Sequence, residues 1–134
     1  MDLFLTIYEW LSILYRDGDL MDTLLSPDGE VVCVLLGIAA LVTSALAAVY
    51  FYILRNAASE NKAGFWWMWL TITFIVNVAI GIALILGMGE LFEGMPVLSA
   101  VLFGLSNGLL SAVFFFVLSC IIKYWSCNLR HIPF

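Results

Sequence analysis

The sequence contains very little charge. Only 11% of its 134 residues are Asp, Glu, Lys or Arg, whereas a soluble domain carries about 25%. Hydrophobic residues make up 64% of the chain. Because so few charged side chains could not cover a water-exposed surface, the composition excludes an ordinary soluble domain and indicates an integral membrane protein.

Histidine and cysteine are also scarce, which limits the chemistry open to the chain. The single histidine, His131, has no discernible Ser, Cys or carboxylate partner, and Cys33, Cys120 and Cys127 form no CxxC pair. Zinc sites and redox motifs need closely spaced ligands. We therefore expect no enzymatic activity, no metal and no cofactor, and we interpret the cysteines as small apolar side chains.

Long apolar runs dominate what is present. Residues 31–54, 65–88 and 97–122 contain no Lys, Arg, Asp, Glu or His. Each run exceeds the roughly 20 residues that a helix needs to cross a bilayer. None shows the alternating segments of about 10 residues that build a membrane β-barrel. Since helices satisfy their own backbone hydrogen bonds in lipid, the sequence predicts an all-α integral membrane fold with three transmembrane helices.

The basic residues predict the orientation of these helices. Arg55 and Lys62 lie between the first two runs, and Lys123 and Arg130 follow the third, whereas Arg16 alone falls on the opposite side. Because the side richer in Lys and Arg faces the cytoplasm, we expect the N-terminus outside and the C-terminus inside. The expected location is a bacterial-type inner (plasma) membrane, and the N-terminus lacks the pattern of a signal peptide.

Residues 1–29 precede the first apolar run. Up to Arg16 their apolar residues recur at the spacing of one helical face, which predicts an amphipathic helix. We expect it along the outer membrane interface, with Tyr8, Trp10 and Tyr15 at headgroup depth; packing on the protein's own helices or on a neighbouring subunit's is an equal alternative. An acidic linker follows and ends at Ser26-Pro27, which predicts a helix start. Residues 30–126 then form the membrane domain and 127–134 a cytoplasmic tail.

The stretch "FGLSNGLLSA", residues 103–112, places polar and small residues inside the third run. On a helical wheel one side carries the small or polar set Ala100, Gly104, Asn107, Gly108, Ser111 and Ala112. The opposite side carries Leu98, Leu102, Leu105, Leu109 and Phe116. Gly104 and Gly108 form a GxxxG motif, which allows two helices to approach closely.

The other runs carry milder stripes, with Thr73, Asn77 and Gly81 in the second and Gly37 and Ser44 in the first. Three helices cannot bury so much small surface among themselves, so we expect a small cyclic homo-oligomer packed through the Gly104 and Gly108 ladder. The residues expected to pack helices are Gly37, Ser44, Gly81, Gly104 and Gly108.

The intramembrane polar residues allow three interpretations. They could hold helices together, line a polar path in an oligomer, or contact a substrate or lipid. The candidates are Thr73, Asn77, Ser106, Asn107 and Ser111. The absence of any intramembrane charge argues against a proton-driven transporter.

The C-terminal tail offers one candidate binding site. Tyr124 and Trp125 are typical interface anchors, and the basic residues there are expected on the inner side. Repeated around a symmetry axis, Lys123, Arg130 and His131 would suit an anionic cytoplasmic ligand such as a nucleotide or oligonucleotide, or a protein partner.

Together these features favour a small oligomeric channel or pore-forming protein. The topology is similar to that of three-span phage holins and of short membrane effectors in bacterial anti-phage defence, although no motif carries either likeness. The alternative is a non-conducting membrane anchor or scaffold subunit of a larger complex.

Overall fold

A computed structural model describes residues 3–4, 6–8, 10, 26–54, 62–88 and 97–125, and this part of the chain is helical with no strand. The long helices are α3 (Pro27–Val49), α4 (Lys62–Gly87) and α5 (Val97–Ile122). A π-helical turn, η1 (Tyr50–Leu54), continues α3, and a 3₁₀ turn, η2 (Lys123–Trp125), follows α5. All three helices are long and apolar enough to cross a membrane, which confirms the predicted three-span fold.

Helix α3 begins where the sequence predicts a cap. The Ser26 side chain accepts a hydrogen bond from the Gly29 backbone N–H at 3.2 Å, and Pro27 occupies the first turn. The acidic residues Asp28 and Glu30 lie in that same turn, where the helix dipole favours negative charge. The cap therefore starts the helix four residues before the predicted apolar run.

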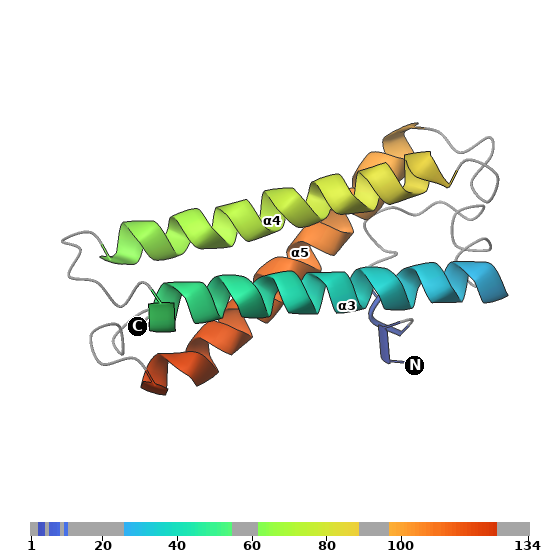
Figure 1. Ribbon diagram of the computed structural model, residues 1–134. Coiled ribbons are helices and arrows are strands. Elements are labelled where there is room, and N and C mark those ends of the chain that lie inside the picture. Colours follow the sequence, from blue (N-terminus) through green and yellow to red (C-terminus); the bar gives the residue numbers. More distant parts are fainter. Residues whose placement is uncertain are drawn as a thin grey trace.

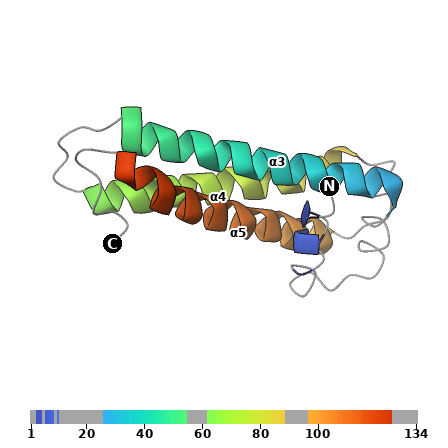
Figure 2. The same cartoon turned by 90° about the horizontal axis from the view of Figure 1, so that it is seen from below.

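Helix α5 holds the bundle together. In Figure 1 it crosses behind α3 and α4, and in Figure 2 it lies on the opposite side of the bundle from α3. It packs extensively against both helices, whereas α3 and α4 contact each other much less. The stripe of small residues on α5 explains this role, because it lets neighbouring backbones come close.

The glycines of α5 pack against α4 of the same chain. A Cβ atom added at Gly104 would lie 2.6 Å from Ile82 Cγ1 and 2.8 Å from the Val78 carbonyl oxygen. A Cβ atom at Gly81 would lie 2.9 Å from the Gly104 Cα. Within one chain the Gly104 and Gly108 ladder therefore packs on α4, and the expected interface between subunits stays a prediction.

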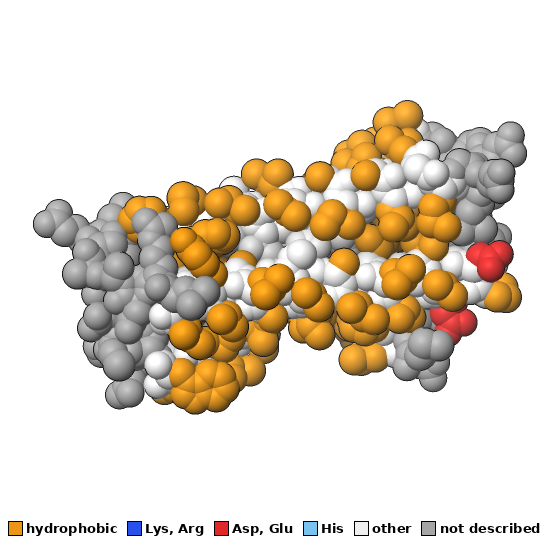
Figure 3. Space-filling view, viewed as in Figure 1, with side chains coloured by type: hydrophobic (Ala, Val, Ile, Leu, Met, Phe, Trp, Pro, Cys, Tyr) orange, Lys and Arg blue, Asp and Glu red, His pale blue; other side chains and the backbone are white. Residues whose placement is uncertain are grey.

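Bulky side chains face outward. Leu98, Leu105, Leu109 and Phe116 are exposed, as the helical wheel of the third run predicts. Figure 3 shows hydrophobic side chains spread along one face of the bundle; among the described side chains on this face, the acidic ones lie near the end where α3 begins. Two buried apolar clusters lie inside, one around Leu36 and Phe103 and one around Phe51, Trp66 and Phe115.

The described residues of the N-terminal segment pack on this bundle. Phe4 lies directly against Gly37 of α3, where no Cβ atom would fit. Tyr8 is buried and stacks on Phe103 of α5, with ring centroids 5.4 Å apart. Tyr8 therefore packs on the protein's own helices, which is the alternative to the lipid interface, whereas Trp10 is 78% exposed. Tyr15 lies outside the described residues.

Candidate functional site

The polar side chains of the spans meet inside the bundle. Asn107 of α5 uses both ends of its amide: Oδ1 accepts from the Tyr8 hydroxyl at 2.5 Å, and Nδ2 donates to the Asn77 carbonyl oxygen at 2.8 Å. Asn107 is 0% exposed. It therefore joins the N-terminal segment, α5 and α4 at one point.

Asn77 continues the network from α4 to α3. Its Nδ2 donates to the Thr43 hydroxyl and to the Thr73 carbonyl, each at 2.9 Å. The Thr43 hydroxyl donates in turn to the Ala39 carbonyl at 2.8 Å. Because the Thr73 carbonyl can only accept, it fixes which end of the Asn77 amide faces it.

Serines add further links between the helices. The Ser44 hydroxyl of α3 lies 2.6 Å from the Ala40 carbonyl oxygen of its own helix and 2.9 Å from the Ser111 carbonyl oxygen of α5. The Ser111 hydroxyl lies 2.7 Å from the Gly108 carbonyl and 3.3 Å from the Thr73 carbonyl. Hydroxyls that bond backbone carbonyls in this way need no water, so they are compatible with a dry interior.

All the predicted intramembrane polar residues are thus buried within one chain. Asn77, Ser106, Asn107 and Ser111 are fully covered, and Thr73 is nearly so. Ser106 bonds the Leu102 carbonyl of its own helix at 3.0 Å and joins no other helix through that bond. The arrangement is that of side chains that hold helices together.

The sequence does not determine the places of two aromatic residues of this interior, Trp66 and Tyr8. Trp66 resembles an interface anchor in the "FWWMW" stretch, yet it is buried and its Nε1 donates to the Ser119 hydroxyl at 3.1 Å. Tyr8 shares an amphipathic segment with other aromatic residues. In the sequence, the signal that either residue is buried is its place on an apolar helix face, and this does not show which residue it contacts.

Two buried polar atoms of the described side chains have no hydrogen-bond partner: Trp69 Nε1 and Asn77 Oδ1. Such groups are rare inside proteins and are costly in a low-dielectric interior. Trp69, Thr73 and Asn77 follow one another at four-residue spacing on α4, so both atoms belong to the stripe that faces α3. Both described polar atoms that lack a hydrogen-bond partner therefore lie on this stripe.

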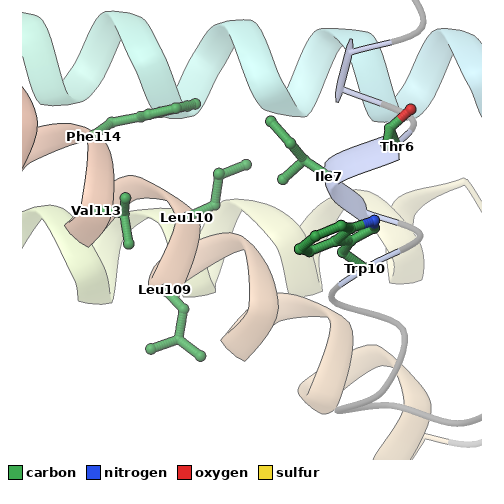
Figure 4. A pocket seen from close by; sticks show the side chains of 7 residues that line it. All are labelled: Thr6, Ile7, Trp10, Leu109, Leu110, Val113 and Phe114. Carbon is green, nitrogen blue, oxygen red and sulfur yellow. The ribbon is translucent and has the colours of Figure 1, made fainter.

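Apolar hollows open on the surface of the described part of the bundle, and two of them bear on function. The first, with a volume of about 480 Å³, lies between the N-terminal segment and α5; Figure 4 shows Ile7 and Trp10 on one side of it and Leu110 and Val113 on the other. The second, of about 440 Å³, lies between α3 and α4 and includes Thr43 and Trp69. We call the second the α3–α4 groove.

The remaining candidates give no site in the part of the chain that the structure describes. Lys123 lies 5.5 Å from the centre of the Tyr124 ring, a cation–π distance. Arg130, His131 and Cys127 lie outside the described residues. Within those residues no three His, Cys, Asp or Glu side chains gather to hold a metal, and Cys33 and Cys120 are free thiols.

Comparison of the chain with protein families, with curated proteins and with solved structures found no match. What the fold and the buried network define is a class, a multi-pass helical membrane protein.

Proposed function

We propose that the chain is a non-conducting membrane subunit that anchors or stabilises a partner in the bilayer. The observation that supports this proposal is the burial of the intramembrane polar groups, because Asn77, Asn107 and Ser111 are each 0% exposed in a single chain. A water-filled path needs polar groups on the surface that lines it. Here the outward surface of the spans is mainly Ile, Leu and Val.

The pore favoured by the sequence stays a prediction. A ring of these subunits would line its axis with outward-facing residues such as Ile75, Val113 and Val117. Exposing Asn107 to such an axis would break its bonds to Tyr8 and Asn77. A conducting state therefore needs a rearranged bundle, whereas the proposed subunit needs none.

Flux through liposomes tests the proposal. Purified protein, reconstituted at increasing protein-to-lipid ratio, should release a trapped dye no faster than protein-free liposomes. Asn107→Leu and Asn77→Leu should leave this baseline unchanged. Currents or leakage that rise with protein content and change in either variant would contradict a non-conducting role. Cross-linking in native membranes should also yield a species containing another protein, and recovery of the chain alone would contradict the anchoring role.

We also propose the orientation with the N-terminus outside and the C-terminus in the cytoplasm, supported by the distribution of Lys and Arg. A reporter fused after Phe134 should be active only as a cytoplasmic reporter; periplasmic activity would reverse the topology. The homo-oligomer remains a prediction without an assigned interface, since α4 covers the glycine ladder. The anionic ligand at Lys123, Arg130 and His131 likewise remains a prediction.

A further inference from the structure

The α3–α4 groove combines an apolar lining with an unpaired donor. It is lined by Thr43, Leu46, Tyr50, Trp69, Thr73 and Val76. The Trp69 Nε1 atom is buried without an acceptor, although the indole forms part of the groove wall. Its volume of about 440 Å³ falls in the range of small-ligand sites, roughly 300–1,000 Å³. A molecule that fits must be apolar along most of its length and must offer one acceptor.

The aromatic end of the groove lies at the depth of lipid ester groups. The α4 span, Ala63–Gly87, has 25 residues, so it is roughly 37 Å long and extends a few ångströms beyond each side of a hydrocarbon core of about 30 Å. This places the boundary of the core near residues 65–66. Trp69 lies about one turn deeper, and helix side chains lean toward the N-terminus, which brings its indole back to that boundary.

Tyr50 reaches the same boundary from α3. The first span, Pro27–Ile53, comprises α3 and most of η1; it has 27 residues and is roughly 40 Å long, so the core again ends near residue 50. The rings of Tyr50 and Trp69 lie 5.0 Å apart. From this pair the groove runs toward the membrane centre, to Thr43 and Val76, over roughly 10 Å of helix rise.

We propose that the α3–α4 groove is a binding site for the acyl chain of a diacyl glycerolipid, whose ester carbonyl accepts a hydrogen bond from Trp69 Nε1. The chain lies along Leu46, Thr73 and Val76, and the headgroup extends past Tyr50. A transmembrane helix of a partner would need a groove of about 30 Å, three times the length present. Hydrocarbon chains carry no acceptor, so at this depth the ester carbonyl is the group of a lipid that can pair with Trp69 Nε1.

The lipid carbonyl can reach Trp69 Nε1 only if the protein atoms that cover this nitrogen move. The Nε1 atom is covered by protein, and the Tyr50 ring that packs on Trp69 is 42% exposed. In this proposal Tyr50, an exposed ring in contact with the Trp69 ring, swings aside when the lipid enters. A rotation of this kind displaces no buried backbone and no bond of the Asn107 network.

A comparison of ester-linked with ether-linked lipids distinguishes specific binding at this site from non-specific contact with lipid. The probes are dioleoyl phosphatidylcholine and its di-O-oleyl ether analogue, which has the same headgroup and chain length but no carbonyl. Native mass spectrometry of the full chain should show roughly two- to thirteenfold tighter retention of the ester lipid, the range expected for one net hydrogen bond. Equal retention of the two lipids by the wild-type protein would overturn the proposal.

Variants then assign the preference to a residue. Trp69→Phe keeps the ring and removes the donor, so it should abolish the ester preference, whereas Trp67→Phe, on a residue 62% exposed and outside the groove lining, should keep it. Val76→Phe narrows the groove at an outward-facing position and should weaken retention of both lipids equally. A preference that survives in Trp69→Phe, or retention unaffected by Val76→Phe, would overturn the site. Circular dichroism checks that each variant is folded.

Discussion

Single polar residues in this chain act as connectors between helices. Asn107 accepts a hydrogen bond from Tyr8 and donates one to α4, and Asn77 donates one to α3. In lipid the alternative to such a bond is an unpaired group, so each connector favours one rotation of its helix. This specificity has an energetic cost, because Asn77 Oδ1 is buried without a hydrogen-bond partner.

Tyr8→Phe tests the hydrogen bond between Tyr8 and Asn107. The substitution keeps the ring that stacks on Phe103 and removes only the hydroxyl, which leaves Asn107 Oδ1 buried without a donor. We expect a loss of about 1 kcal/mol in the free energy of unfolding, measured as a lower midpoint in thermal or denaturant unfolding in detergent. Tyr124→Phe is the matched control, because Tyr124 is 63% exposed at the end of α5. Equal midpoints for the wild type and Tyr8→Phe would show that the bond adds nothing.

At the scale of helices, the bundle is asymmetric. Helix α5 presents its small face to α4, where glycine backbones nearly touch, and it also packs closely on α3. The α3–α4 contact is slight by comparison and leaves a groove on the lipid side. The position of α5 against both helices therefore determines which stripes are buried. In this arrangement the GxxxG motif packs α5 on α4 within one chain.

Gly104→Ala tests the α4–α5 contact. The new Cβ atom would lie 2.8 Å from a backbone oxygen of α4, so the two helices must separate along their length. We expect a destabilisation of roughly 1–3 kcal/mol with no change in oligomer mass. Gly87→Ala is the control: nothing lies within 4 Å of its added Cβ, so its effect should be neutral or slightly stabilising. Dissociation of an oligomer by Gly104→Ala, with unfolding unchanged, would return the ladder to an interface between subunits.

At the scale of the whole molecule, the sequence predicts the elements better than their pairing. The apolar runs, the Ser26 cap and the exposed face of α5 follow from composition and from the helical period, which act within one segment. The partner of each helix face does not follow from composition, since a stripe of small residues packs equally well on another helix of the same chain or on a second copy of the chain. The sequence leaves the places of Tyr8 and Trp66 open for the same reason, because aromatic residues near helix ends suit both a lipid interface and a core.

The central claim is that the intramembrane polar groups lie within the subunit, away from any aqueous path. Ser111→Cys tests it most directly, since the substitution is nearly isosteric at a residue that is 0% exposed beside α3 and α4. In a background without the native cysteines, and in nanodiscs open to water on both sides, a charged thiol reagent should leave this cysteine unmodified until the protein is unfolded. Tyr124→Cys should react readily under the same conditions. Modification of the Ser111→Cys protein in its folded state, at a rate near that of Tyr124→Cys, would place Ser111 on a water-filled path and contradict the account.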